Sequence, residues 1–467
     1  MSVGVSAVGF DRRTFLGATG LAVLGGWTGR DRDWDRLRRA LTGRLVLPGD
    51  ADYDTARRPY NTVYASRRPA AVALCASESD VARCLVFAAE ERLPVAARGG
   101  RHSYAGYSAP EDGLVVDVAA LREVRPGPEA VVGGGIALID LYERLGAAGR
   151  LLPAGTCRSV GIGGLALGGG ISVVGRKYGL TCDHLRGARV VTPDGSVRVV
   201  DEEHEPDLFW ALRGGGGGNF GIVTSFRFAT DEARDLVPFE LRTPAGAAVD
   251  VFGAWQEWVV DQPDELWAAC RLSSGRRTTA VVSGCWVGTP ESLTPVLDRF
   301  AAKVPVTRRD LRPMDYPTAM RHYANCLKGC PPFAGTPFVA SSRMLRRPLD
   351  PARAVGLLDG ARSTSVLFDS FGGAIARVGA TDTAFPHRDA IASAQVYVDA
   401  AGVPEAQARQ QVATVRDGMG LDTGYVNYID PEMPDWRHAY YGPNLPRLQQ
   451  VARRYDPDHV LAFPQSL

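Results

Sequence analysis

The sequence lacks several features that indicate whole classes of protein. Beyond the first 30 residues, no apolar run reaches the roughly 18 residues that a membrane-spanning helix needs, so we expect no stable membrane insertion. The formal net charge is only +1, and no basic run is interleaved with aromatic residues. We therefore expect no nucleic-acid partner.

Metal-binding patterns are missing as well. The eight cysteines form no C-x-x-C pair and show no metal-ligand spacing with the seven histidines, so we expect no metal site. Cys326 and Cys330 stand close enough for a disulfide. Buried free thiols are the interpretation that we favour for them.

A nicotinamide-dinucleotide site is not indicated either. The stretch "AVVGGGIALIDLYERLGAAG" (130–149) has a strand pattern, glycines and a helix pattern in the right order. The fingerprint G-x-G-x-x-G, however, needs a third glycine where Leu138 stands. No acidic residue closes a following strand at the usual interval, so this stretch does not predict the dinucleotide fold.

The length and composition of the chain are those of a globular protein with more than one core. The chain has 467 residues, of which 45% are hydrophobic and 22% charged, too many for a single ordinary core. Strand and helix patterns alternate over 50–232, and the composition changes over 233–422. Residues 423–467 are dense in aromatic and turn residues. We therefore expect an α+β fold.

The first 30 residues resemble a targeting signal. In "DRRTFLGATGLAVLGG", Arg12 and Arg13 precede a short, weakly apolar run, which is typical of a twin-arginine export signal. An ordinary arginine-rich leader is the alternative, because no clean A-x-A cleavage site follows. We expect export, or a cytoplasmic location if the leader is not functional.

Two glycine-rich stretches carry reactive side chains. They are "RGGRHSYAG" (98–106), with His102, and "PAGTCRSVGIGGLALGGG" (153–170), with Cys157. Glycine lets the backbone approach a phosphate or a flat ring closely. Both stretches therefore predict a bound ligand beside a histidine or a cysteine.

Together with two further segments, these stretches carry a resemblance to a known family. The segments are "GNFGIVT" (218–224) and "YVNYID…YYGPN…YDP…FPQS" near the C-terminus. In this order, over about 50–467, they resemble the berberine bridge enzyme-like FAD-linked oxidases of the vanillyl-alcohol oxidase superfamily. The resemblance implies a PCMH-type FAD-binding domain of two α/β subdomains over 50–232. It also implies a substrate-binding domain over 233–422, whose antiparallel sheet is covered by helices, and a segment over 423–467 that returns to the FAD domain.

The resemblance implies that FAD is the cofactor and that it is bound covalently at two points. His102 would bond to the 8α-methyl carbon of the flavin and Cys157 to its C6 position. A hydrogen-bonding histidine and an unattached cysteine are the alternatives. The resemblance implies that further residues contact the cofactor: Arg98, Gly99, Gly100, Arg101, Ser103, Val160, Gly163, Gly164, Gly168, Gly169, Gly218, Asn219, Gly221, Ile222, Val223, Tyr441 and Asn444.

Arg101 departs from the family pattern, which usually has glycine just before the histidine. If the position needs a positive φ, Arg101 introduces strain. If it does not, the guanidinium is available to assist a phosphate.

The same resemblance implies a tyrosine from "YVNY" as the catalytic base, and we favour Tyr425 over Tyr428. If this stretch is a strand, Tyr425 and Tyr428 point to opposite faces, and only one of them faces the cleft. Asp369 in "SVLFDSFGG" is a second catalytic candidate, and a structural carboxylate is its alternative role.

The resemblance implies an oxidase of hydroxyl or hemiacetal groups that passes electrons to O2. Val160, three residues after Cys157, is the residue type that admits oxygen in the family. Relatives oxidise glycosylated antibiotics of secondary metabolism or oligosaccharides, and the sequence does not separate a bulky natural product from a carbohydrate. An oxidative cyclase and a non-redox cyclase or binding protein on the same scaffold are the alternatives. Four tryptophans are candidates for stacking on a sugar: Trp255, Trp258, Trp267 and Trp286. For the first two, a place in a helix core is the interpretation that we favour.

Overall fold

The domain expected to bind FAD, over about 50–232, is called the FAD-type domain below. Its N-terminal region is built around a four-stranded sheet. The computed structural model describes residues 32–467, and the expected export signal lies outside the described residues. Strand order in this sheet is β1-β2-β4-β3, with β2, β4 and β3 parallel and β1 antiparallel. Its strands are β1 (Arg44–Val46), β2 (Ala71–Leu74), β3 (Val95–Arg98) and β4 (Leu114–Asp117).

A second sheet of five antiparallel strands follows in the order β5-β6-β10-β8-β9. Its strands are β5 (Val124–Arg125), β6 (Glu129–Gly133), β8 (Leu185–Val191), β9 (Val197–Val200) and β10 (Ile222–Ala229). A two-stranded sheet pairs β7 (Arg150–Leu151) with β11 (Asp231–Glu232). Because β11 directly precedes the third sheet, this pairing lies where the chain leaves the FAD-type domain.

The third sheet has seven strands, all antiparallel, in the order β15-β12-β14-β13-β17-β18-β16. Its strands are β12 (Leu236–Arg242), β13 (Leu266–Ser273), β14 (Thr279–Val287), β15 (Arg308–Leu311), β16 (Phe338–Leu345), β17 (Thr364–Ser370) and β18 (Ala392–Asp399). This antiparallel sheet and the mixed α/β region before it confirm the predicted fold class.

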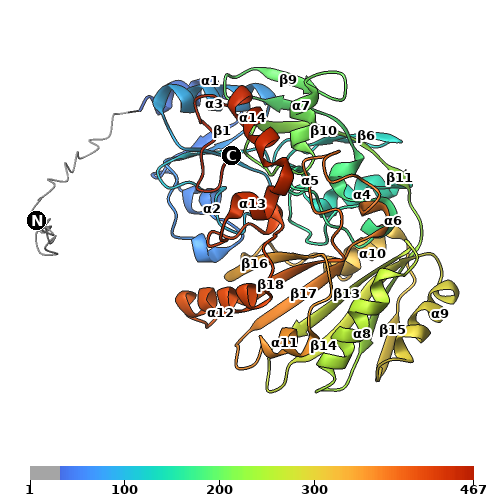
Figure 1. The fold of residues 1–467 in the computed structure, drawn as a ribbon. Coiled ribbons are helices and arrows are strands. Elements are labelled where there is room, and N and C mark those ends of the chain that lie inside the picture. Colours follow the sequence, from blue (N-terminus) through green and yellow to red (C-terminus); the bar gives the residue numbers. More distant parts are fainter. Residues whose placement is uncertain (1–31) are drawn as a thin grey trace, which may run out of the picture. The chain divides into compact units, whose positions relative to one another are not determined.

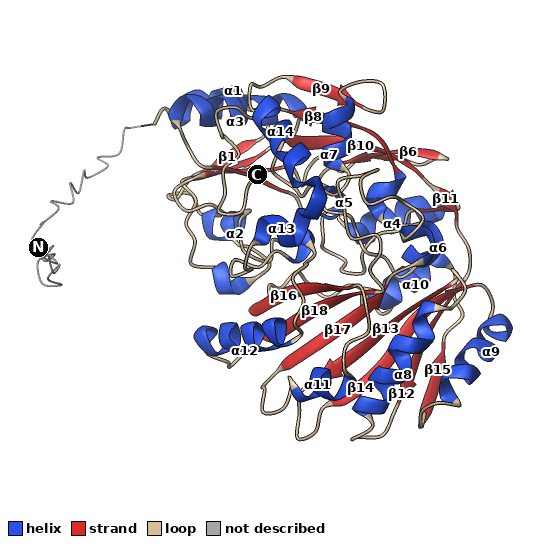
Figure 2. Cartoon of the chain, viewed as in Figure 1, coloured by secondary structure: helices blue, strands red, loops and turns tan. Residues whose placement is uncertain are grey.

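Helices cover one face of the seven-stranded sheet, as Figures 1 and 2 show. On β17, Val366 and Phe368 share a core with Phe252 and Trp255 of α8. Leu367 lies on the opposite face and packs on the core of the FAD-type domain. The covering helices are α8 (Ala248–Val260), α9 (Pro290–Ala301), α11 (Pro351–Gly356) and α12 (Glu405–Gly418). The helix α10 (Tyr316–Tyr323) packs instead on the core of the FAD-type domain.

The remaining helices belong to the FAD-type domain and to the C-terminal segment. They are α1 (Trp34–Ala40), α2 (Tyr53–Arg57), α3 (Glu78–Glu91), α4 (Leu138–Ala147), α5 (Ile162–Leu167), α6 (Gly175–Tyr178), α7 (Pro206–Leu212), α13 (Trp436–Tyr441) and α14 (Leu445–Tyr455), with 3-10 turns η1 (Thr62–Tyr64), η2 (Thr181–His184), η3 (Gly373–Ile375), η4 (Val426–Tyr428) and η5 (Gly442–Asn444). Within residues 32–467, no helix has the length and apolar character needed to cross a membrane.

The C-terminal segment packs on both parts of the structure. α14 packs against α7 of the FAD-type domain, and the two lie side by side in Figure 1. Arg416 of α12 forms a buried ion pair with Asp430 at 2.8 Å. The side chain of Gln465 donates to the Asp430 carbonyl at 2.8 Å. The segment therefore joins the helical cover of the large sheet to the FAD-type domain.

Candidate active site

The loop that follows β3 presents a row of unpaired backbone amides. Within residues 32–467, none of the five N–H groups from Gly99 to Ser103 donates to a protein acceptor. Arg101 in the middle of the row has a φ of 67°, the left-handed conformation that favours glycine. Consecutive amides around such a residue form a nest for an anion, so this loop fits a phosphate group.

The two arginines of this loop are held by the protein itself. Nε of Arg98 donates to Asp117 at 2.8 Å, and burial lowers the pKa of Arg98 to about 10. The guanidinium of Arg101 donates to the Thr55 carbonyl at 3.1 Å and lies 3.7 Å from Asp117. These contacts offset part of the strain at Arg101.

His102 is a half-buried, neutral imidazole with one nitrogen in use. Its Nε2 lies 2.9 Å from Oγ of Ser159, and its ring stacks on Tyr60 with the centroids 3.8 Å apart. Burial, helped by the charge of Arg158, lowers the pKa of His102 to about 4. Its Nδ1 has no hydrogen-bond partner in the described chain.

Cys157 carries an exposed thiol close to the same loop. Burial nevertheless raises the pKa of this thiol, and Arg158 lowers it only in part. The Cys157 thiol is therefore surrounded by protein on most sides and open to solvent on one. The turn ends at Val160, whose amide donates to the Cys157 carbonyl at 3.1 Å.

The two loops meet backbone to backbone at glycines. A Cβ on Gly100 would lie 2.2 Å from the amide nitrogen of Gly161 and 2.5 Å from the Ser159 carbonyl oxygen. A Cβ on Gly163 would lie 2.7 Å from the Gly134 carbonyl oxygen, whereas a Cβ on Gly164 would meet nothing within 4 Å. The glycines therefore bring His102 and Cys157 together and leave open space beside α5.

The other glycines of this stretch touch the C-terminal segment. A Cβ on Gly168 would lie 2.2 Å from the side chain of Asn427, and one on Gly169 would lie 3.1 Å from the Phe385 ring. The Gly170 amide donates to the hydroxyl of Tyr425 at 2.8 Å. This run of glycines accommodates the segment that carries the two candidate tyrosines.

The residues of "GNFGIVT" lie at the start of β10. Ile222 and Val223 are buried and pair with Val191 and Val190 of β8. Gly218 and Gly221 have φ values of 81° and 153°, which favour glycine.

Two polar side chains hold this region to the C-terminus. Nδ2 of Asn219 donates to the Gly215 carbonyl at 3.0 Å, and its Oδ1 accepts from the Leu467 amide at 3.3 Å. Asn219 also bonds to buried Tyr441. Asn444 donates to the Ala380 carbonyl at 2.8 Å. Asn219 and Asn444 therefore have structural contacts of their own.

The candidate tyrosines lie on a 3-10 turn, which corrects the strand expectation. Tyr425 is the residue before η4 and Tyr428 is its last residue. Residues three apart in a 3-10 helix lie on the same side, and the two rings meet edge to face with centroids 5.0 Å apart. The prediction that they point to opposite faces was wrong.

The hydroxyl groups of the two tyrosines have different surroundings. Tyr425 is buried, and its oxygen accepts from the Gly170 amide and from Nδ2 of Asn427, both at 2.8 Å. Tyr428 is half-buried and its hydroxyl has no hydrogen-bond partner in the described chain. Burial raises the pKa of both. Only the Tyr428 hydroxyl is free for a ligand.

Asp369 shares the environment of Tyr428. It lies on β17, on the face away from the helices, and is 4% exposed. Burial raises its pKa to about 7, and Arg271 lowers it only in part. After burial, the charges of Asp369 and Cys157 are among the groups that raise the pKa of Tyr428. These three side chains, from distant parts of the chain, therefore lie close enough to interact.

Sequence reasoning missed the polar side chains that complete this site. Tyr104 stacks on Tyr428 with centroids 5.0 Å apart, and its hydroxyl accepts from Nε2 of Gln395. Burial raises the pKa of Tyr397 to about 12, and Cys157 adds to the shift. The alternation of Ser393, Gln395 and Tyr397 in "ASAQVYVD" is the signal that would have identified a polar strand face.

In the second domain the structure overturns one sequence-based interpretation and decides between the alternatives of another. Cys326 and Cys330 form a disulfide rather than free thiols. The four tryptophans that were candidates for sugar stacking are all less than 9% exposed, so the core role favoured for Trp255 and Trp258 is confirmed. Trp255, Trp258 and Trp286 belong to the core on the helix side of the sheet, and Trp267 belongs to the core of the FAD-type domain.

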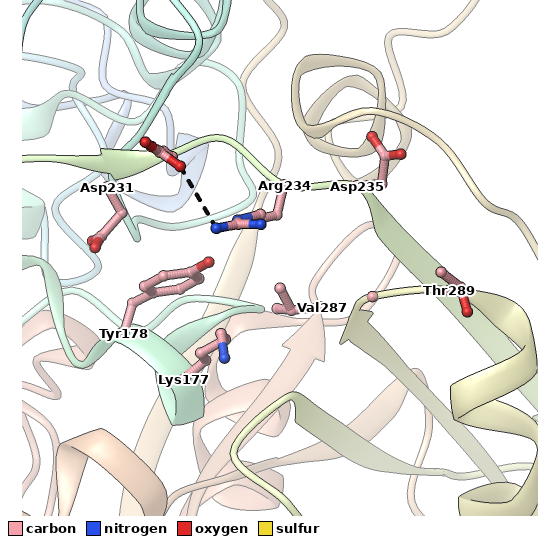
Figure 3. A pocket seen from close by; sticks show the side chains of 9 residues that line it. Lys177, Tyr178, Asp231, Arg234, Asp235, Val287 and Thr289 are labelled. Atoms are coloured by element: carbon pink, nitrogen blue, oxygen red, sulfur yellow. Dashed lines mark ion pairs between the residues drawn. The ribbon is translucent and has the colours of Figure 1, made fainter.

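A pocket of about 640 Å³ lies elsewhere, around the β11–β12 connection (Figure 3). Its charged residues compensate one another, since Arg234 pairs with Glu232 and Lys177 with Glu265. None of the predicted site residues lines it. We therefore place the candidate active site at His102 and Cys157 and not at this pocket.

The amide nest, the facing glycines and the open space beside α5 fit a dinucleotide with a flat ring. Pyrophosphate oxygens would match the amides from Gly99 to Ser103, and His102 and Cys157 lie on the two loops that meet at Gly100 and Gly161. These features define an FAD-binding protein. In agreement, residues 69–201 match a family model described as "FAD binding domain" and residues 424–467 one described as "Berberine and berberine like".

Known proteins resemble the chain over almost its whole length. It is 33% identical to the uncharacterised FAD-linked oxidoreductase YgaK of Bacillus subtilis, covering 91% of this chain and 97% of YgaK. The structure of wild-type Physcomitrella patens BBE-like 1 has a TM-score of 0.86 and 29% identity, covering 92% and 98% of the two chains. The structure of a glucooligosaccharide oxidase from Acremonium strictum with a 6-S-cysteinyl, 8α-N1-histidyl FAD has a TM-score of 0.82 and 27% identity, covering 91% and 97%. The chain belongs to the berberine bridge enzyme-like family of FAD-linked oxidoreductases and is an enzyme of that class.

Proposed function

We propose that the protein is an oxidase that carries a doubly attached FAD and converts the hemiacetal of an oligosaccharide to a lactone. The observation that carries the proposal is the position of Tyr428, which is stacked on Tyr104 with centroids 5.0 Å apart and lies close enough to Asp369 and Cys157 for their charges to raise its pKa. The likeness to a glucooligosaccharide oxidase supports the choice of a carbohydrate. When bound, FAD accepts the hydride from the substrate carbon and passes the electrons to O2, giving hydrogen peroxide.

Two features support covalent attachment at both residues. Nδ1 of His102 is unpartnered on a neutral ring, because burial holds the pKa of His102 near 4. The Cys157 thiol is exposed, and Arg158 beside it favours the thiolate. Either group is a competent nucleophile toward an electron-poor ring. Two bonds would hold the cofactor while the substrate side stays open.

Proton removal is assigned to Tyr428 together with Asp369. The Tyr428 hydroxyl is free, whereas the Tyr425 oxygen already accepts two hydrogen bonds. In the proposed step, Tyr428 takes the proton of the anomeric hydroxyl as its own proton passes, through a hydrogen-bonded water, to ionised Asp369. Ring stacking with Tyr104 orients Tyr428 for this transfer. The hemiacetal loses one proton and one hydride in total, which balances the two-electron oxidation.

The attachment is tested on the purified protein by acid precipitation and intact mass. Wild type, His102→Ala and Cys157→Ala should each retain one FAD mass, and the double variant should release it. Loss of all FAD from the denatured wild type would exclude covalent attachment.

The oxidation is tested by adding cellobiose anaerobically and following the flavin absorbance. Bleaching, with peroxide formed when air is admitted, supports an oligosaccharide oxidase. A flavin that stays oxidised with cello-, xylo- and chito-oligosaccharides contradicts the substrate class. A product with a new ring in place of a lactone would indicate an oxidative cyclase.

A further inference from the structure

The face of the seven-stranded sheet that carries Asp369 continues beyond the proposed catalytic groups. Strand alternation places Arg271 of β13 and Leu367 of β17 on this face. Arg271 is exposed, and Val281, Leu367 and Gln395 are half-buried. This part of the sheet is therefore accessible to a ligand that reaches past Asp369.

Cross-strand register places three arginines on this face, and they differ in their partners. Arg308 is opposite Arg242, which is opposite Val281, and Val281 is opposite Arg271. Arg242 pairs with Glu240 at 2.7 Å and Arg308 with Asp310 at 3.8 Å.

Arg271 is the exception on this face. It has no hydrogen bond or ion pair with any described residue between 32 and 467. Its guanidinium is therefore an uncompensated cation that offers a full set of donors.

Register also gives the place of Arg271 relative to the reaction. Arg271 is opposite Leu367, two residues along β13 from Ala269, which is opposite Asp369. Diagonal neighbours in such a pair are about 7–8 Å apart, so the long Arg271 side chain can reach a group on the sugar next to the oxidised one. Burial holds the pKa of Asp369 near 7, so this carboxyl does little to neutralise Arg271 below that pH.

We propose that Arg271 binds a carboxylate on the substrate, one sugar residue from the oxidised carbon. The substrate class is then an acidic oligosaccharide with a uronic acid next to its reducing-end sugar. This inference rests on the proposed oxidase function and deepens it. Guanidinium and carboxylate match as a two-pronged, charge-assisted pair. Neutral polar groups nearby, such as those of Gln395 and Tyr397, suit the sugar hydroxyls.

The first test compares two disaccharides on the holoenzyme. They are cellobiose and cellobiouronic acid, which differ only in a carboxylate at C6 of the non-reducing residue. We expect wild type to favour the acid by about tenfold in kcat/KM, through KM, as one charge-assisted hydrogen bond allows. Arg271→Gln should remove this preference, and Arg271→Glu should reverse it. The control Arg242→Gln, which removes a paired arginine of the same face, should keep it.

A second test needs no turnover. The methyl β-glycosides of the same two sugars are not hemiacetals, so their binding is measured by calorimetric titration. The acidic glycoside should bind to wild type about tenfold more tightly than the neutral one, and this preference should shrink at high salt. Arg271→Gln should bind the two glycosides equally. Equal binding to wild type, no binding of either, or a preference that Arg271→Gln retains would overturn the inference. Arg271-dependent binding without oxidation of the free sugars would instead refute the oxidase function and leave the carboxylate subsite standing.

Discussion

Tyr425 and Tyr428 differ in what their hydroxyl oxygens can still do. The Tyr425 oxygen receives hydrogen bonds from Gly170 and Asn427, while the Tyr428 hydroxyl is unpartnered in the described chain. A catalytic base needs a free oxygen within reach of the substrate. At the scale of single residues, hydrogen-bond occupancy therefore distinguishes two tyrosines that look equivalent in the motif.

Tyr428→Phe should lower kcat by about 10²–10⁴-fold, the usual contribution of a positioned general base, with little change in KM. Tyr425→Phe should instead lower the free energy of unfolding by about 1–3 kcal/mol, because it leaves the Gly170 amide without its acceptor. Anaerobic flavin reduction and urea unfolding measure the two effects. A larger loss of rate in Tyr425→Phe would reverse the assignment.

Asp369 makes the rate depend on pH near neutrality. The carboxyl accepts a proton only when ionised, and burial raises its pKa to about 7. We expect kcat of wild type to rise with pH through about 7. Asp369→Asn should be slow and show no such rise. A rise of the same size in both proteins would remove Asp369 from the proton transfer.

The same shift links Asp369 to stability, with a definite sign. The folded protein keeps this proton up to about pH 7, whereas the unfolded chain releases it near pH 4. The stability contributed by the group is therefore greatest below about pH 4 and falls as pH rises toward 7. We therefore compare the urea midpoints of Asp369→Asn and wild type at two pH values. The midpoint of the variant, relative to that of wild type, should be higher at pH 8 than at pH 5. An unchanged difference between the two pH values would contradict the raised pKa.

At the scale of elements, the cofactor site depends on two loops that touch without side chains. The loop after β3 and the turn before α5 meet at Gly100 and Gly161. The structure also explains Arg101, whose positive φ is required by the loop and is offset by contacts to Thr55 and Asp117. Local backbone geometry therefore decides where His102 and Cys157 lie.

Gly100→Ala should separate these loops, because its Cβ would lie 2.2 Å from the Gly161 nitrogen. We expect loss of bound FAD and a destabilisation of about 1–3 kcal/mol, as for other overpacked sites. The ratio of flavin to protein absorbance and the Tm check this. Gly49→Ala is the matched control, since nothing lies within 4 Å of its Cβ. Full FAD content in Gly100→Ala would show that the loops need not touch.

Element types were predictable from local patterns, and short irregular turns were not. The Ser, Glu and Asp cluster from Ser77 and the helical spacing after it favour a helix, and Asp194-Gly195 favours a hairpin turn; the structure has α3 and the turn between β8 and β9 at these places. The stretch "YVNY" alternates like a strand but folds as η4. Its contacts with the glycines of 168–170 come from a segment more than 250 residues away, so no local pattern encodes them.

For the whole molecule, the C-terminal segment connects the helical cover of the large sheet to the FAD-type domain. The central contact is the buried pair of Arg416 and Asp430. A buried cation that loses its partner is costly, although Asp417 also pairs with Arg416 at 2.7 Å.

Asp430→Ala should therefore lower the free energy of unfolding by about 3 kcal/mol, at the low end for a broken buried pair. Glu123→Ala is the control, because its pair with Arg125 is exposed on both sides and should cost less than about 1 kcal/mol. Urea unfolding of both variants measures the difference. If both variants lost a similarly small free energy of unfolding, the C-terminal segment would be held by apolar contacts alone.

The sequence by itself determined the family, the FAD-type loops and the two candidate attachment residues. It did so because glycine conformations and the reactive side chains beside them lie within a few adjacent residues. Only the tertiary structure distinguished Tyr428 from Tyr425 and revealed the neighbourhood of Tyr104, Gln395 and Arg271. Those relations depend on the register between strands roughly 100 residues apart, and such long-range pairing is set by packing of the whole sheet rather than by any short pattern.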